Sequence, residues 1–245
     1  MAQQKIRLRE RGVRVFAGRL YNHDYLWFSS NEISKMSTTQ PLLHNYALCY
    51  ALSQRSYRVC IGSTPKYVED MAGEFRAMPL YATPAQASNV KRTTITFNAV
   101  DSLTLTTGDS KAMNTPNLGK RVYLNLVWEP HGAQRPELGY EFYAFTFDDY
   151  HLPSAFRLGK KGAPVRVRWE ELPDATAVFL DQEQRPTHVV NPLDVSGQLV
   201  SYDPVSIPPH LLLRAVTLKR DWFVLSGKHT VQVPKSVMVR AGGVS

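Results

Sequence analysis

Alternation between apolar and polar side chains recurs along most of the chain and predicts a protein built mainly from β-strands. Residues 140–147 are rich in aromatic residues and are predicted to form a strong strand. Residues 94–98 and 102–106 alternate in the same way, and we expect them to form the arms of a threonine-rich hairpin. The predicted strands are 13–21, 25–28, 94–98, 102–106, 121–128, 140–147, 164–169, 211–218, 221–225 and 230–233.

Helical patterns are confined to the first third of the chain. Residues 42–54 are apolar on nearly every side, which indicates a helix that is buried rather than amphipathic. Pro41 fits the first turn of this helix, because its missing N–H would have no partner there. A weaker helix is predicted over 65–74, and the polar stretch 29–40 is predicted to be a loop.

Helices near the N-terminus followed by many strands predict an α+β fold with a mainly antiparallel sheet. No repeat or linker divides the sequence, so we expect residues 1–245 to form a single domain with loop insertions. Residues 107–120 and 129–139 are rich in turn-forming residues and are predicted surface loops. Five prolines between 181 and 210 predict a segment that runs over the surface.

Composition favours a soluble protein whose partner carries negative charge. Of the 245 residues, 43% are hydrophobic and 20% are charged, which excludes a disordered chain. Lys and Arg outnumber Asp and Glu by 29 to 21, and this excess attracts polyanions. Cys49 and Cys60 are too few for a disulfide scaffold and lack metal-ligand spacing. No signal peptide or membrane-spanning run is visible, so we expect a cytoplasmic protein with no membrane partner.

The densest positive charge lies between Tyr150 and Trp169, a stretch without an acidic residue. Its basic residues are Arg157, Lys160, Lys161, Arg166 and Arg168, and Gly159 and Gly162 allow its backbone to approach a ligand closely. In the strand 164–169, Arg166 and Arg168 share one face about 7 Å apart, near the spacing of successive phosphates. We predict that this segment binds a polyanion. The solvated face of an exposed strand is the alternative.

Two further basic groups have a less specific pattern. The first group contains only one acidic residue, Glu10, beside Lys5, Arg7, Arg9, Arg11, Arg14 and Arg19. For residues 1–11, a disordered basic arm explains the pattern equally well. Lys91 and Arg92 lie at the base of the predicted threonine-rich hairpin. Such an arm could wedge against an RNA strand, and an ordinary exposed hairpin is the alternative.

No recognised catalytic motif occurs in the sequence. The seven histidines have no metal-binding spacing, and no nucleophile elbow, P-loop or dinucleotide-binding glycine motif is present, so we expect no metal or cofactor. His44 lies in the predicted core helix, where a hydrogen-bonded structural role is favoured. His151, beside the basic segment, is the better candidate for a general acid or base in RNA cleavage.

Three segments together carry a resemblance to a known family. They are 42–52 (LLHNYALCYAL), 81–84 (YATP) and 156–162 (FRLGKKG). In combination they resemble the Csc-one subunit of type I-D CRISPR effectors, the Cas-five-type member of the RAMP superfamily. The resemblance extends from about residue 13 to the last strands.

This resemblance implies an RRM-like (ferredoxin-like) RAMP core, a protruding thumb hairpin over about 88–120, and a role in holding the 5′ handle of the crRNA. It also implies partners: a Cas-seven-type backbone subunit, a Cas-ten-type large subunit, and target DNA near the protospacer-adjacent motif. We expect a non-catalytic subunit that caps the backbone filament. The alternative is a metal-independent endoribonuclease that processes pre-crRNA. The predicted RNA-binding residues are Arg157, Gly159, Lys160, Lys161, Gly162, Arg166, Arg168, Lys91 and Arg92.

Overall fold

The largest element of the fold is a seven-stranded sheet. The computed structural model describes residues 4–33, 36–54, 77–87, 90–99, 117–126 and 139–243. The strands of the sheet are β2 (Val13–Asn22), β5 (Leu42–Leu43), β6 (Leu80–Ala82), β7 (Ala85–Ala87), β10 (Tyr140–Phe147), β11 (Ala155–Leu158) and β12 (Ala163–Glu171). Their order is β11–β12–β2–β10–β7–β5, with β6 also beside β10, and every pair is antiparallel.

The central order β12–β2–β10–β6 is that of a ferredoxin-like core. Helix α1 (Asn45–Ser53) lies between β5 and β6 in the chain and contacts β6 and β11. A second helix would precede the last strand in the full pattern, whereas residues 148–154 turn directly from β10 towards β11. The expected ferredoxin-like α+β fold is confirmed, with one helix in the described part of its core.

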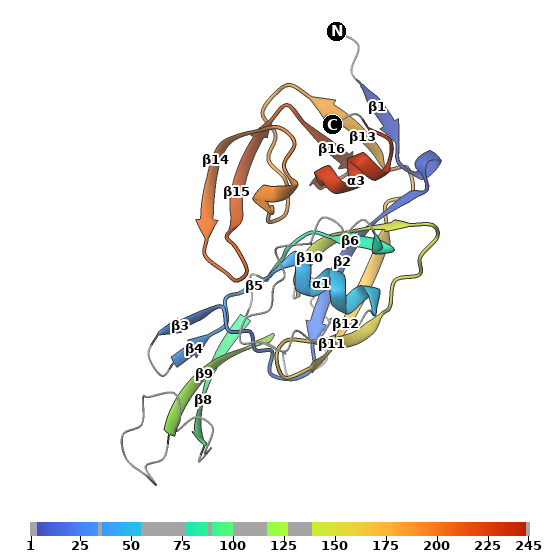
Figure 1. Cartoon of the computed structure of the whole chain (residues 1–245). Helices are drawn as coiled ribbons and strands as arrows, with labels where there is room; N and C mark the ends of the chain where they lie inside the picture. The colour runs from blue at the N-terminus through green and yellow to red at the C-terminus, as the bar shows by residue number, and fades with distance from the viewer. Residues whose placement is uncertain are drawn as a thin grey trace.

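A second, four-stranded antiparallel sheet lies above the first in Figure 1. It consists of β1 (Lys5–Arg7), β13 (Thr176–Leu180), β16 (Asp221–Ser226) and β17 (His229–Gln232). Helix α3 (Lys235–Arg240) follows it, and the hairpin of β14 (Gln198–Val205) and β15 (Leu212–Lys219) stands beside it. Short 3-10 turns at Arg9–Arg11 and Pro192–Asp194 complete the upper part.

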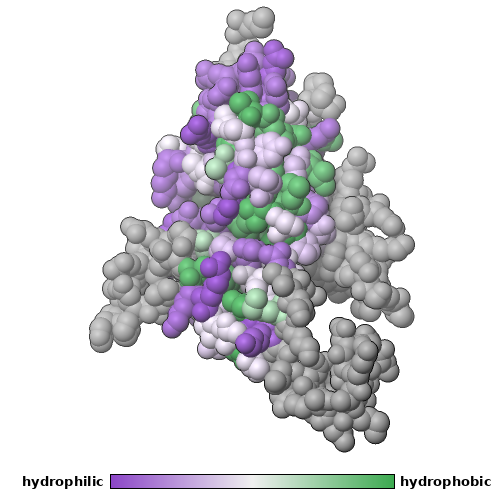
Figure 2. Space-filling model, turned by 90° about the vertical axis from the view of Figure 1, so that its left-hand side faces the viewer, coloured by the Kyte–Doolittle hydropathy of each residue, from purple (hydrophilic) through white to green (hydrophobic). Residues whose placement is uncertain are grey.

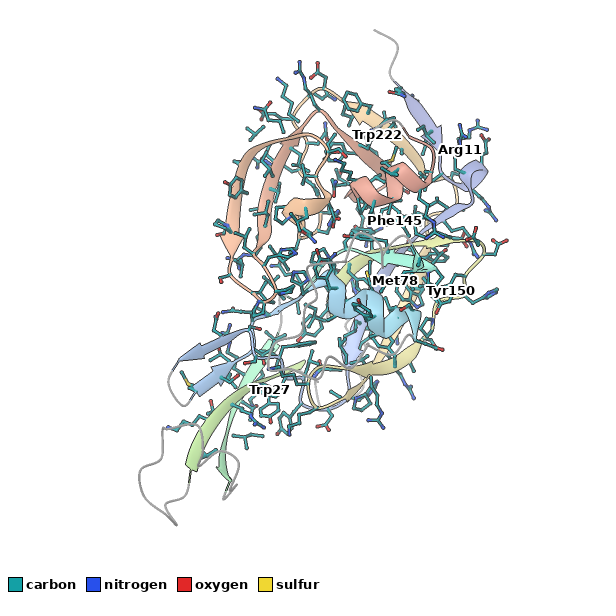
Figure 3. All side chains as sticks on the ribbon, in the orientation of Figure 1. Arg11, Trp27, Met78, Phe145, Tyr150 and Trp222 are labelled. Carbon is teal, nitrogen blue, oxygen red and sulfur yellow. The ribbon has the colours of Figure 1, made fainter. Side chains whose placement is uncertain are left out.

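One apolar core joins the two sheets. Val15 and Phe145 lie opposite each other on β2 and β10, and both are fully buried. They belong to the same cluster of buried side chains as Trp222 and Val224 of the second sheet and Val237 of α3. In Figure 3, Phe145 lies below Trp222. The second sheet therefore covers one end of one face of the seven-stranded sheet.

A third sheet has the order β3–β4–β9–β8. Its strands are β3 (Asn31–Ile33), β4 (Met36–Thr38), β8 (Val90–Ala99) and β9 (Asn117–Leu126). Strands β8 and β9 pair along ten residues and project away from the body of the protein, at the lower left of Figure 1.

The core helix starts later than the sequence predicts. His44 is its N-cap, and the imidazole Nδ1 accepts a hydrogen bond from the Tyr46 N–H at 3.3 Å. Leu42 and Leu43 form β5, which pairs with β7, so Pro41 lies outside the helix and its predicted place in the first turn is wrong. The cause is non-local, because the apolar pattern alone does not distinguish a buried strand from the start of a buried helix.

Other differences arise where strands pair over long distances. Residues 25–28 make only an isolated bridge, between Leu26 and Leu124, and the predicted loop 29–40 contains β3 and β4. The partner of β8 is β9 rather than 102–106, so the last residues of the predicted loop 107–120 are in a strand. The predicted helix 65–74, residues 102–106 and nearly all of the loop 129–139 lie outside the described residues.

The proline-rich stretch 181–210 is predicted to run over the surface, but part of it is buried. It contains β14, and its own residues Val189, Val190 and Ile207 are buried. The side of the molecule that carries β14 and β15 shows hydrophobic areas among hydrophilic ones (Figure 2). Val200 and Leu211 are among the exposed apolar residues of this hairpin.

Candidate nucleic-acid interface

Strand β12 separates apolar from basic side chains, as its alternation predicts. Val165 and Val167 are buried, whereas Arg166 and Arg168 are exposed on the other face. Strand β12 lies between β11 and β2 within the sheet, and its two valines belong to the main apolar core. The predicted common face of the two arginines is therefore confirmed.

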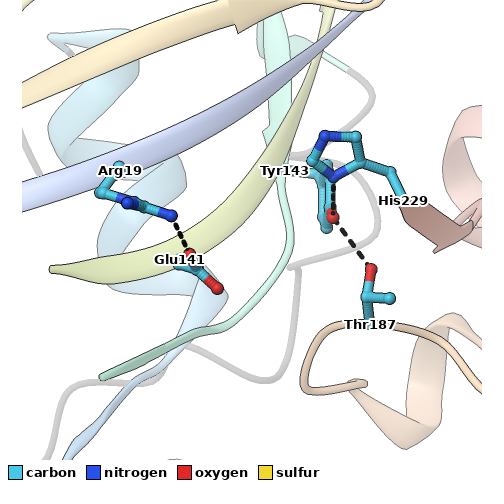
Figure 4. A network of polar contacts seen from close by, with 5 residues as sticks. All are labelled: Arg19, Glu141, Tyr143, Thr187 and His229. Atoms are coloured by element: carbon cyan, nitrogen blue, oxygen red, sulfur yellow. Dashed lines mark hydrogen bonds and ion pairs between the residues drawn. The ribbon is translucent and has the colours of Figure 1, made fainter. Parts of the chain in front are cut away.

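The register adds residues of β2 to this face. In the antiparallel register of β12 and β2, Arg166 lies opposite Tyr21, and Arg168 lies opposite Arg19. The Arg168 guanidinium lies 5.6 Å from the centre of the Tyr21 ring. The Arg19 guanidinium forms an ion pair with the Glu141 carboxylate of β10 (Figure 4). We call Arg19, Tyr21, Arg157, Arg166 and Arg168 the basic face.

The basic loop, residues 159–162, connects β11 to β12. It is closed by one hydrogen bond from the Arg157 side chain and by one within its own backbone. Arg157 Nη1 donates to the Gly162 carbonyl at 2.9 Å, and the Gly162 N–H donates to the Gly159 carbonyl at 3.0 Å. Both glycines have positive φ, +82° for Gly159 and +62° for Gly162, a conformation that favours glycine. Lys160 and Lys161 are exposed at the tip.

The loop is held against Trp27. The Lys160 N–H donates to the Trp27 carbonyl at 3.0 Å, and the Lys160 ammonium lies 5.3 Å from the centre of the Trp27 ring. The Arg121 guanidinium of β9 lies 4.4 Å from the same ring. Trp27 therefore connects the basic loop to the middle of strand β9 in the projecting hairpin. Lys91 and Arg92 are exposed on β8 of that hairpin, rather than on the seven-stranded sheet.

Three carboxylates of this region are engaged in ion pairs with arginines other than Arg157 and Arg166. Glu171 accepts two hydrogen bonds from Arg14, Glu141 pairs with Arg19, and Asp148 pairs with Arg240. Within the described residues, Arg157, Lys160, Lys161 and Arg166 form no ion pair. These four cations are thus available to an external anion.

A pocket of about 470 Å³ adjoins the basic face where the second sheet rises above it. Its lining includes Ala17, Arg19, Tyr143, Arg168 and Glu170 of the seven-stranded sheet, and Thr187, Lys228 and His229 of the upper part. The Tyr143 hydroxyl lies 2.8 Å from His229 Nδ1 and 2.9 Å from Thr187 Oγ1, so it joins the two parts (Figure 4). Burial raises the pKa of Tyr143 and lowers that of His229.

Sequence reasoning did not connect Arg19 and Tyr21 with the basic segment, nor His229 with any site. The alternation of 13–21 places Arg19 and Tyr21 on one face, but nothing local shows that β2 lies beside β12. His229 is more than 80 residues from Tyr143, its hydrogen-bond partner. Long-range pairing of this kind leaves no sequence signal in a single chain.

The favoured structural reading of His44 is confirmed. Burial, together with nearby His210, lowers the pKa of His44 to about 3, so the imidazole is neutral at physiological pH. His151 is exposed in the turn after β10. No group of three or more potential metal ligands occurs in the described part of the chain. Among its helices, none has the length and apolarity needed to cross a bilayer.

Comparison with known proteins identifies the family. No curated protein matches the chain. Among solved structures, it is similar to a chain of the type III-B Cmr-beta complex bound to cognate target RNA and AMPPnP, seen by cryo-EM. The identity is 7% and the TM-score 0.45, and the match covers 83% of this chain and 86% of that chain. The family described as type I-D CRISPR-associated protein Cas5/Csc1 matches residues 13–242, and the chain therefore belongs to this family, as the sequence motifs predict.

Proposed function

We propose that the chain is a non-catalytic crRNA-binding subunit of a type I-D CRISPR interference complex and that it holds the 5′ handle of the crRNA. The observation that carries this proposal is the set of cations on one surface, Arg157, Lys160, Lys161 and Arg166, that have no ion-pair partner among the described residues. Family membership supplies the CRISPR context.

The spacing of the basic face suits a single RNA strand. Side chains two residues apart on β12 are about 7 Å apart, close to the distance between successive phosphates of an extended strand. Guanidinium groups bind phosphate through paired hydrogen bonds. Tyr21 lies among these cations and offers an aromatic ring of the kind on which unpaired bases stack.

The finer roles follow from the family resemblance. The subunit would cap the filament of Cas-seven-type subunits, contact the Cas-ten-type large subunit and help to position target DNA near the protospacer-adjacent motif. The β8–β9 hairpin, which carries Lys91 and Arg92, is the part of the molecule that we assign as the thumb. Its projection from the body gives it the reach to contact a nucleic acid or a neighbouring subunit.

A binding role agrees with the environment of the histidines. A general acid or base needs a pKa near the working pH, and burial takes His44 far below it. His151 is the remaining candidate for the endoribonuclease alternative. Cleavage of labelled repeat RNA in EDTA, abolished by His151→Ala, would establish that alternative and contradict the proposal.

The test is the salt dependence of RNA binding. The full chain would be titrated against fluorescently labelled single-stranded handle RNA between 50 and 300 mM salt, a range over which phosphate contacts weaken by orders of magnitude. Replacing Lys161 and Arg166 by alanine should reduce the slope of log K against log salt by about 1.4, or about 0.7 for each lost phosphate contact.

A charge-matched control separates the basic face from net charge. Lys235 and Arg185 are exposed outside the seven-stranded sheet, so their double alanine variant removes the same charge from a different surface. Its slope should stay near that of the unaltered chain. Equal slopes for the two double variants would contradict the assignment of the basic face, and no salt dependence in any variant would contradict RNA binding through phosphates.

A further inference from the structure

The pocket beside the basic face is built by a small residue between two large ones. Ala17 of β2 pairs with Tyr143 on one side and with Glu170 on the other. Since neighbouring strands are about 4.8 Å apart, Tyr143 and Glu170 are separated by about 10 Å across the alanine methyl group. The turn before β17 and the loop at Thr187 contribute Lys228, His229 and Thr187 to the lining.

The size of the pocket suits one nucleotide. Its volume of about 470 Å³ lies within the range of about 300–1,000 Å³ that is typical of small-molecule sites. It opens beside Arg168, one of the cations of the basic face. An RNA strand that lies along this face would therefore pass the mouth of the pocket.

The lining carries charges of both signs. Glu141 and Glu170 contribute to it together with Arg19, Arg168 and Lys228. Glu141 is paired with Arg19, whereas the Glu170 carboxylate forms no hydrogen bond or ion pair with any described residue. An uncommitted carboxylate accepts hydrogen bonds only, so it selects a ligand that donates them.

The aromatic wall of the pocket is held in place. Tyr143 and His229 rings are 5.6 Å apart at 85°, and their hydrogen bond uses His229 Nδ1. The other ring nitrogen, Nε2, has no hydrogen-bond partner among the described residues. Glu170, Glu141 and Lys228 line the same pocket as the His229 imidazole.

Guanine is the base whose edge complements this carboxylate. Its N1–H and N2–H donors lie side by side on the Watson–Crick edge and match the two oxygens of one carboxylate. Adenine, cytosine and uracil each place an acceptor next to their donor, and that acceptor would face a carboxylate oxygen. Lys228 also lines the pocket and can bind a phosphate next to the inserted nucleotide.

Building on the proposed RNA binding, we propose that this pocket takes one unpaired guanine of the bound RNA strand and that Glu170 reads its Watson–Crick edge. The pocket then adds base selectivity to the sequence-independent grip of the basic face. In this arrangement Ala17 provides the floor, and Tyr143 and His229 provide the wall.

The experiment compares four RNAs that differ at one position. Oligouridines with a single central G, A, C or U would be titrated against the full chain by fluorescence anisotropy at fixed salt. We expect about tenfold tighter binding of the G-containing strand, within the range expected for a bidentate contact to a base. Glu170→Gln should remove the preference for G, because an amide offers one donor and one acceptor. Glu183→Gln, the same change at an exposed position outside the pocket, should retain it.

A second variant tests the shape of the pocket. Ala17→Leu fills its floor and should abolish the preference for G while the salt slope stays unchanged; its unfolding curve would be recorded alongside. Free GMP serves as a competitor of the G-containing RNA. Equally tight binding of the free nucleotide and the RNA would mean that the pocket is a site for a free nucleotide, which would overturn the proposal.

Each outcome distinguishes the two proposals. Equal affinity for all four RNAs with a normal salt slope would overturn the guanine pocket and leave RNA binding intact. A preference for another base, or a preference for G that survives Glu170→Gln, would overturn the role of Glu170. Absence of RNA binding altogether would overturn both.

Discussion

Lys160 is joined to Trp27 through both its backbone and its side chain. Its N–H donates to the Trp27 carbonyl at 3.0 Å, and its ammonium group lies 5.3 Å from the centre of the indole ring. Lys161, the next residue, is exposed. Two adjacent lysines with the same charge thus differ in their contribution to the fold.

Alanine substitutions should separate these contributions. Lys160→Ala removes a cation–π contact and should lower the free energy of unfolding by about 0.5–1 kcal/mol. Lys161→Ala should leave it within about 0.5 kcal/mol of the unaltered chain. Both should weaken RNA binding. Urea unfolding of the two variants measures the difference, and equal losses of stability would show that the Trp27 contact contributes nothing.

The two glycines of the basic loop offer a matched comparison. Both have positive φ, so alanine is strained at either position. A Cβ at Gly159 would also lie 2.8 Å from the Trp27 carbonyl oxygen, whereas at Gly162 its nearest atom, Arg157 Cδ, would be 3.8 Å away. Gly159→Ala should therefore cost about 1–3 kcal/mol more than Gly162→Ala in denaturant unfolding. The reverse order would mean that the loop does not rest against Trp27.

The Tyr143 hydroxyl should stabilise the contact between the two sheets. Tyr143→Phe removes its hydrogen bonds to His229 and Thr187 and should cost about 1 kcal/mol of unfolding free energy. Tyr21→Phe is the control, because no hydrogen bond is found for its hydroxyl among the described residues, and it should change stability by less than about 0.5 kcal/mol. Thermal and urea unfolding of both variants would show whether the loss is specific to Tyr143.

Asp194 should make the stability of the protein depend on pH. It accepts a hydrogen bond from the Tyr81 hydroxyl, and the loss of water around its carboxyl raises its pKa to about 7. The unfolded chain releases this proton near pH 4. Because the folded chain then holds more protons between pH 4 and 7, the contribution of Asp194 to stability falls as the pH rises through this window.

Asp194→Asn tests this dependence. The amide mimics the protonated acid at every pH. The free energy of unfolding of the variant, measured relative to that of the unaltered chain, should therefore increase by about 2–3 kcal/mol from pH 5 to pH 8, at about 1.36 kcal/mol per unit of pKa difference. Burial also lowers the pKa of His188, to about 4, but that effect is common to both proteins and cancels in the comparison. Asp174→Asn, at an exposed turn, is the control. A difference between variant and parent that does not change with pH would contradict the raised pKa.

Several elements were predictable because their pattern is local. Strand β10 has the predicted bounds 140–147, and the alternation of β12 correctly separates Val165 and Val167 from Arg166 and Arg168. The positive charge and the two glycines of the basic segment also predict a surface loop, but they do not predict the conformation of that loop. These features depend on which side chains are apolar and on the two-residue period of a strand.

The sequence by itself determined several of the strands, the basic segment and the motifs that carry the family resemblance. Only the tertiary structure decided that β2 lies beside β12, that β8 pairs with β9, and that His229 reaches Tyr143 to form one wall of a pocket. The physical reason is that hydrophobic periodicity reports which face of a segment is buried, but not which distant segment buries it. The candidate base pocket exists only where two sheets meet, and their contact is a property of the folded chain as a whole.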